Sequence, residues 1–213
     1  MQVDKIVVGS LQTNCFLVWD EEKHAAVIDP GDQFPVIGQV IQKHGLLPKA
    51  VLLTHGHFDH IGAVNPLVKD YGVKVYAHEA EKELLTLAPE EYYELVGMGR
   101  CFQVPVDCYL KDGEKVTVGG MEFTCLHTPG HTKGSCVYLC GTAMFSGDTL
   151  FCGTVGRTDF YGGNMQQMLA SGKRLAALSG DYHVYCGHGP DTTLQNERET
   201  NFYLGEADYD ALY

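Results

Sequence analysis

The segment 54–60, with sequence THGHFDH, places three imidazoles and one carboxylate within a few positions. Imidazole and carboxylate groups bind divalent metal ions such as zinc, iron and manganese. Residues two apart on an extended chain face the same side, so His55 and His57 can hold one ion. Asp59 and His60 follow at the start of an expected helix and can face a second ion. The segment therefore predicts a metal site.

Three later segments offer further ligands of the same chemical types. His131 follows Pro-Gly, Asp148 follows Ser-Gly, and His188 follows Cys-Gly. Each comes where an expected strand stops, and the preceding glycine permits a tight turn there. We expect these three side chains to meet the ligands of segment 54–60 at one rim of the sheets.

The elements that must position these ligands follow from the hydrophobic pattern. Short alternating or apolar runs predict strands, and apolar residues at three- and four-residue spacing predict helices. Each half of the chain contains both, which indicates an α/β fold of two mixed sheets packed face to face with helices outside. The expected strands cover residues 3–8, 14–19, 25–29, 50–53, 73–77, 115–118, 121–127, 135–140, 143–146 and 182–186. The expected helices cover 35–45, 59–71, 79–99 with a break at Pro89, 164–179 and 191–204.

Composition and charge limit the classes of function. The chain has 213 residues, of which 45% are hydrophobic and 20% charged, and this matches one globular domain over 1–213. The net charge of −12 repels polyanions, so nucleic acid is not an expected partner. No apolar run reaches the roughly 18–20 residues that span a bilayer, and the N-terminus lacks a signal-peptide layout. We therefore expect a cytoplasmic protein with no membrane partner; no oligomeric state is indicated.

Two other groups of residues have simple expected roles. The acidic residues within 79–94 predict a solvated helix face. The eight cysteines are scattered without a C-x-x-C pair, so we expect buried, inert thiols, including Cys152 near the ligand segments.

Five segments in this order, THGHFDH, TPGHTKG, SGDTLF, VGRTDF and CGHGP, resemble the metallo-β-lactamase superfamily and its small glyoxalase II-like branch. The resemblance spans about residues 8–205 and implies a four-layer αβ/βα sandwich with two divalent metal ions per chain. Zinc is the expected metal, and iron and manganese are the alternatives. By this resemblance metal one would be bound by His55, His57 and His131, metal two by Asp59, His60 and His188, and Asp148 would bridge them. Zinc β-lactamases have a cysteine at a ligand position, so Asp148 argues against lactam specialisation.

The resemblance also implies an activity, the hydrolysis of a thioester such as S-lactoylglutathione by a metal-bridging hydroxide. Two divalent ions can lower the pKa of a bridging water from 15.7 to about 7, and a thiolate leaving group needs little acid assistance. The expected catalytic residues are Asp59, which would orient the hydroxide, and Asp148. Arg157 lies where the glyoxalase II pattern has a basic residue that contacts glutathione, so it is expected to bind substrate. An internal ion pair with Asp159 is the alternative for Arg157.

Other functions compete with this interpretation. A persulfide dioxygenase shares several of these motifs but uses one iron, and its usual pattern lacks the Gly-His-Gly around His188. A metal-binding or regulatory protein without turnover is the second alternative. Glyoxalase II enzymes carry an additional C-terminal helical region that contacts glutathione, whereas 25 residues follow His188 here, so the thiol and the acyl group stay open. Asp29 resembles an aspartate of the family that lies behind the ligands, and an Asx turn before Pro-Gly is its alternative.

Overall fold

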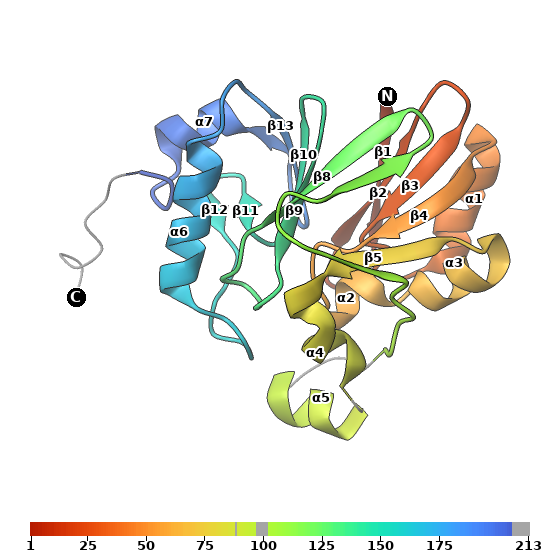
Figure 1. The fold of residues 1–213 in the computed structure, drawn as a ribbon, viewed down its shortest axis with the longest axis horizontal. Coiled ribbons are helices and arrows are strands. Elements are labelled where there is room, and N and C mark those ends of the chain that lie inside the picture. The colour runs from red at the N-terminus through yellow and green to blue at the C-terminus, as the bar shows by residue number, and fades with distance from the viewer. Residues whose placement is uncertain (88, 97–101, 206–213) are drawn as a thin grey trace.

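The structure, a computed structural model, describes residues 1–87, 89–96 and 102–205. Two six-stranded mixed sheets face each other, and helices cover the outer face of each sheet (Figure 1). Two helices, α1 (Phe34–His44) and α3 (Val64–Tyr71), lie outside the first sheet, and α6 (Met165–Ala176) and α7 (Leu194–Thr200) lie outside the second. The predicted α/β sandwich of four layers is confirmed.

The first sheet has the strand order β1-β2-β3-β4-β5-β6. Its first three strands form an antiparallel meander, and the remaining strands are added in parallel. Helix α1 (Phe34–His44) connects β3 to β4, as a parallel connection requires. The strands are β1 (Gln2–Val8), β2 (Thr13–Trp19), β3 (His24–Ile28), β4 (Leu47–Leu52), β5 (Lys74–His78) and β6 (Cys108–Leu110).

The second sheet has the order β14-β13-β10-β9-β8-β7. Strands β7 to β10 form an antiparallel meander, and β13 joins β10 in parallel through the crossover helix α6 (Met165–Ala176). The strands are β7 (Lys115–Val118), β8 (Met121–His127), β9 (Cys136–Cys140), β10 (Ala143–Gly147), β13 (His183–Cys186) and β14 (Thr192–Thr193). A separate hairpin consists of β11 (Leu150–Phe151) and β12 (Thr154–Val155).

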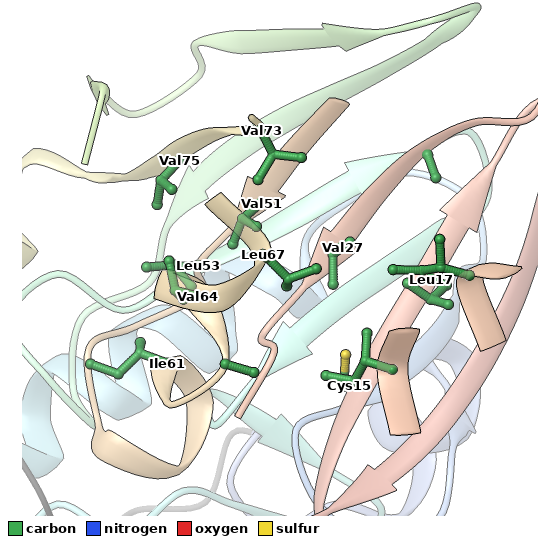
Figure 2. Packing of buried hydrophobic residues seen from close by; sticks show 14 of the residues in the cluster. Cys15, Leu17, Val27, Val51, Leu53, Ile61, Val64, Leu67, Val73 and Val75 are labelled. Carbon is green, nitrogen blue, oxygen red and sulfur yellow. The ribbon is translucent and has the colours of Figure 1, made fainter. Parts of the chain in front are cut away.

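The core is divided among the layers by the two-residue period of the strands. In β2 every residue is buried, and successive side chains point to opposite faces. Leu17 packs toward α1 and α3, whereas Phe16 and Val18 pack between the sheets with Phe145 of β10. Figure 2 shows Leu17 in the outer cluster, which also contains Leu67 of α3. Side chains are buried on both faces of β2 and of the end of β4, residues 50–52. This part of β4 leads directly into segment 54–60.

The predicted helix 59–71 is wrong as one continuous helix. The chain forms α2 (Phe58–Ile61) and then α3 (Val64–Tyr71), with Gly62 and Ala63 between them. Pro66 explains the break, because it has no N–H for the carbonyl of residue 62 and its ring would clash there. The Ala63 N–H instead donates to the Pro30 carbonyl oxygen at 2.9 Å. The break leaves α2 as a single turn that presents two candidate ligands.

Other element boundaries differ from the predictions at their ends. The helix-prone segment 79–99 has the expected break before Pro89. It consists of a 3-10 turn (Glu79–Glu81), α4 (Lys82–Thr86) and α5 (Pro89–Val96), and 97–99 lie outside the described residues. The expected helix 191–204 begins later, as α7 (Leu194–Thr200), because the Thr193 hydroxyl accepts from the Asn196 N–H and caps it.

Two expectations concern membranes and thiols. No helix in the described part of the chain is long and apolar enough to cross a bilayer. The expectation that Cys152 is buried is wrong, because it lies exposed in the turn between β11 and β12. Cys108 is partly exposed, and Cys101 lies outside the described residues. The buried cysteines are Cys15, Cys125, Cys136, Cys140 and Cys186.

Candidate metal centre

Seven candidate ligands come from the ends of strands in both sheets. His55 and His57 follow β4, and Asp59 and His60 lie on α2. The remaining three follow strands of the second sheet: His131 after β8, Asp148 after β10 and His188 after β13.

Backbone contacts between the sheets bring these strand ends together. The Asn14 N–H of β2 donates to the Gly187 carbonyl oxygen at 2.7 Å, next to His188. The Asn14 side chain donates to the carbonyl oxygen of Cys186 at 2.9 Å. The Cys136 N–H of β9 donates to the Thr54 carbonyl oxygen at 2.9 Å, next to His55. These hydrogen bonds join the two sheets beside the candidate ligands. They therefore fix the ligand loops of the first sheet relative to those of the second.

The first ligand set consists of His55, His57 and His131, whose ring nitrogens lie within 4.8 Å of one another. The closest pair is His57 Nδ1 and His131 Nε2, at 2.8 Å. All three side chains are buried. Burial, reinforced by the neighbouring imidazoles, lowers the pKa of His55 and His57 well below the usual value. These two rings are therefore neutral near pH 7, the form that binds metal.

The second ligand set consists of Asp59, His60 and His188, again with ligand atoms within 4.8 Å. Asp59 Oδ2 lies 3.3 Å from His188 Nε2 and 3.5 Å from His60 Nε2. Burial opposes protonation of His60, but the carboxylates of Asp59 and Asp148 outweigh it and raise the pKa of His60 to about 10. Burial likewise opposes ionisation of Asp59, yet the adjacent imidazoles hold its pKa well below the usual value. The charge of this set therefore favours a cation, and in the metal-free protein the raised pKa of His60 reflects the same preference.

Asp148 lies between the two sets. Its Oδ2 is 3.4 Å from His131 Nε2 of the first set, and its Oδ1 is 3.4 Å from His60 Nε2 of the second. Oδ2 also lies 3.6 Å from His188 Nε2. One carboxylate thus faces both groups of ligands.

Hydrogen bonds on the far side of the rings set the orientation of four histidines. His60 Nδ1 lies 2.9 Å from Asp29 Oδ2, and His55 Nδ1 lies 3.1 Å from the Thr54 hydroxyl oxygen. The Nδ1 atoms of the other two are held by carbonyl oxygens, that of Arg157 for His131 at 2.7 Å and that of Leu11 for His188 at 3.1 Å. In each case Nε2 is left to face the centre, as is typical of metal-binding histidines. Asp29 also accepts from the Thr54 N–H and hydroxyl, so it is part of this support and not a simple Asx turn.

The unpaired polar atoms of the site fit a divalent metal. His55 Nε2, His57 Nε2 and Asp148 Oδ1 are buried and have no hydrogen-bond partner. An unpaired buried polar atom costs about 1–3 kcal/mol, so the two of them that face the centre, His55 Nε2 and Asp148 Oδ1, call for a ligand. His57 faces the centre with Nδ1, which lies 2.8 Å from His131 Nε2. Imidazole nitrogens and carboxylate oxygens are donors that zinc, iron and manganese accept. The residues present therefore fit a metal centre.

A cavity of about 440 Å³ opens directly onto these ligands. Apolar side chains form much of its wall: Leu11, Phe58, Phe151, Val155 and Phe160. The titratable side chains on the wall are candidate ligands or Arg157. The cavity thus places an apolar wall beside the candidate ligands.

Arg157 lies on the cavity wall, where its guanidinium is 3.8 Å from the centre of the Phe160 ring. It also donates two hydrogen bonds to Asp159, from Nε at 2.7 Å and from Nη2 at 2.6 Å. Both side chains are more than half exposed. The internal ion pair of Arg157 with Asp159 is therefore present. Because Arg157 also lies on the cavity wall, the predicted contact with substrate stays a prediction.

Comparison with known proteins identifies the family. A sequence model of the metallo-beta-lactamase superfamily matches residues 8–188. The chain belongs to this superfamily. The hydroxyacylglutathione hydrolase GloC of Haemophilus influenzae is 37% identical over 215 residues, which cover 96% of this chain and 98% of that protein.

Metallo-beta-lactamase superfamily structures share the whole fold. The crystal structure of the B3 metallo-beta-lactamase BLEG-1 has a TM-score of 0.88 at 35% identity and covers 95% of this chain and 99% of its own. The structure of TTHA1623 in a di-iron-bound form has a TM-score of 0.83 at 39% identity and covers 94% and 100%. The chain is a metallo-hydrolase of this superfamily with His and Asp metal-binding groups.

Sequence reasoning missed one acidic residue beside the ligands. Glu81 was expected on a solvated helix face within 79–94, but its side chain is 1% exposed. Its carboxylate accepts hydrogen bonds from the backbone on both sides of the site. The pattern of the segment contained no signal for this burial, because Glu79 and Glu83 are neighbours of the same type.

Proposed function

We propose that the protein hydrolyses a thioester, such as S-lactoylglutathione, at a centre of two divalent metal ions. The observation that supports two ions is the arrangement of Asp148 between two complete sets of three ligands. His55, His57 and His131 would hold one ion, and Asp59, His60 and His188 would hold the other. When bound, such ions supply Lewis acidity and lower the pKa of a coordinated water to about 7.

Asp59 has a second role in this proposal, the orientation of the attacking water. Its Oδ2 accepts from the Thr13 hydroxyl at 2.8 Å, which holds the carboxylate in place from β2. The pKa of Asp59 is held well below the usual value, chiefly by His60 against the effect of burial, so the carboxylate remains an acceptor. A fixed, charged acceptor beside the cavity can align one proton of the water and leave its lone pair toward the substrate.

The cavity supports a thioester over substrates with a poorer leaving group. Its titratable wall residues are the ligands themselves or Arg157, and Arg157 remains protonated at any working pH. No other described residue on this wall is an acid that could protonate a departing group. A thiolate with a pKa near 8.5 leaves without that help. The name of the Haemophilus influenzae relative supports a hydroxyacylglutathione as the substrate.

The test is turnover by metal-loaded protein with three probes. Thioester cleavage is followed by the release of free thiol from S-lactoylglutathione with zinc, iron or manganese bound. A chromogenic cephalosporin is the second probe, because BLEG-1 is named a metallo-beta-lactamase. Oxygen uptake with glutathione persulfide is the third. Thiol release that exceeds the other two activities is expected; oxygen uptake or lactam cleavage without thiol release would contradict the proposal, and metal binding without turnover would indicate a regulatory protein.

A further inference from the structure

Glu81 connects the two loops that carry the first ligand set. Its Oε1 accepts from the Gly56 N–H at 2.7 Å, and Gly56 stands between His55 and His57. Its Oε2 accepts from the Gly134 N–H at 2.8 Å and from the Thr132 hydroxyl at 2.9 Å. Thr132 directly follows His131. One carboxylate thus ties a loop of the first sheet to a loop of the second.

The loops are shaped to receive this carboxylate. A Cβ would meet the Glu81 backbone nitrogen at Gly134 and the Leu85 side chain at Gly56 even more closely than the carboxylate. It would also stand 2.5 Å from Glu81 Oε2 at Gly134 and 3.2 Å from Oε1 at Gly56. Both distances are below those of ordinary contacts, so the absence of a side chain at Gly134 above all lets the carboxylate approach. The site for Glu81 is therefore built into both loops.

Stability alone does not account for a carboxylate at this position. Burial raises the pKa of Glu81 to about 7, against the opposing effect of its three donors, so ionisation here is costly. Lys133, whose charge acts on Glu81, forms its ion pair with Glu83 instead, at 2.7 Å on the surface. What Glu81 supplies that an apolar side chain cannot is two acceptor oxygens, one for each loop.

We propose that Glu81 is a positioning residue that sets the distance between His55/His57 and His131, and so the metal affinity of this ligand set. The inference rests on the proposed metal centre. The hydrogen-bond donors to Glu81 are Gly56, Thr132 and Gly134, and none of them is a candidate ligand, so Glu81 acts through these three residues. Partners behind metal ligands typically change metal affinity by 10–100-fold when they are removed.

The substitution Glu81→Gln tests this role with almost no change in volume. Glutamine has one acceptor oxygen and one NH₂ donor. Whichever way the amide is turned, the NH₂ group faces a backbone N–H, that of Gly56 or that of Gly134. One loop is therefore released in either orientation. Glu83→Gln is the matched control, since Glu83 lies two residues away and is exposed with Lys133 and Tyr161.

The readout is the binding of Co²⁺, measured by competition with a chromophoric chelator and by the visible absorption of the bound ion. Wild-type protein should bind two ions, and Glu83→Gln should bind each of them with the wild-type affinity. Glu81→Gln should bind one of the two ions 10–100-fold more weakly, with an altered absorption spectrum. His188→Ala should weaken the binding of the other ion. A variant with both Glu81→Gln and His188→Ala should therefore lose tight binding of both ions.

The outcomes separate this inference from the metal centre on which it rests. Wild-type affinities and spectrum in Glu81→Gln would overturn the role of Glu81 while leaving the centre intact. A wild-type protein that binds no Co²⁺ would overturn the centre itself. If circular dichroism shows that metal-free Glu81→Gln is unfolded, Thr132→Val decides, because it keeps the shape of the side chain and removes the hydroxyl that donates to Glu81 and contacts Ser135 Oγ. That variant should weaken the same ion several-fold, and unchanged affinity would contradict the proposal.

Discussion

His60 Nε2 lies 3.3 Å from His188 Nε2, although the two residues are 128 positions apart in the chain. Each ring is held from behind, His60 by Asp29 and His188 by the Leu11 carbonyl oxygen. Two rings fixed with their nitrogens this close favour a shared cation, and Asp59 adds its carboxylate from α2. This relationship connects opposite ends of the sequence and leads to the first prediction.

Removal of one histidine should remove one metal ion and leave the fold. Wild-type protein should hold close to two ions per chain, and His188→Ala close to one, because the ligands of the first set remain. The His188 side chain is 27% exposed, so its loss leaves no large buried cavity. Elemental analysis after dialysis gives the metal content, and circular dichroism monitors the fold. One ion in saturated wild-type protein, or a globally unfolded variant, would contradict the dinuclear centre.

Metal binding to the second set should release protons and depend on pH. In metal-free protein the pKa of His60 is about 10, because Asp59 and Asp148 outweigh the effect of burial. His60 is therefore protonated at neutral pH and must lose that proton to bind metal. The affinity of this set should rise as pH increases toward 10, by about tenfold per pH unit for each proton released.

The first set should behave differently at the same pH. Burial keeps the pKa of His55 and His57 well below 6.5, so neither ring has a proton to lose near pH 7. Calorimetry in buffers of different ionisation enthalpy measures proton release for each ion. In His188→Ala only the first set should bind metal tightly. If this variant released as many protons on metal binding as the wild-type protein, the rings of the first set would not be the neutral ones.

Arg157→Ala should affect anionic substrates selectively. The guanidinium is on the cavity wall, and its exposed pair with Asp159 can exchange for a substrate carboxylate. We expect KM for an anionic thioester to rise roughly tenfold, with metal content and neutral thioesters unchanged, and Arg157→Lys to be intermediate. Asp159→Asn is the control, since it frees the guanidinium and should not raise that KM. An equal loss for both substrates with a lower Tm would mean that Arg157 only supports the loop.

Gly187→Ala should disturb Asp148 while sparing the sheets. A Cβ at position 187 would clash with Asp148 Oδ1 and approach the Gly147 carbonyl oxygen to 2.9 Å. The carboxylate would have to move from its place between the ligand sets, so both ions should bind more weakly and turnover should fall at least tenfold. Gly120→Ala is the control, because the atom nearest its Cβ is 3.8 Å away. Metal titration and Tm of both variants test this, and unchanged metal affinity in Gly187→Ala would speak against Asp148 as a shared ligand.

Local patterns in the sequence predicted most strands of both sheets, although not β6 or β14, and brought out the candidate ligands. The period of β2 and the spacing in segment 54–60 are properties of neighbouring residues, so extended and turn geometry determine which side chains share a face. The break between α2 and α3 was also within reach, because the effect of Pro66 depends only on the residue four positions earlier. The exposure of Cys152 could not be predicted from the sequence, because it depends on what packs against the β11–β12 turn.

The sequence by itself determined that histidines and aspartates stand where strands end, because strand length and turn residues are local. Only the tertiary structure decided that Asp148 lies between two ligand sets, that Arg157 pairs with Asp159, and that Glu81 is buried between two loops. These are contacts between segments far apart in the chain or choices among several possible partners. The geometry around Asp148 and Glu81 depends on how the two sheets pack, and no spacing within a single segment encodes that distance. The Arg157–Asp159 pair is local, and the structure decided only that this partner is the one used.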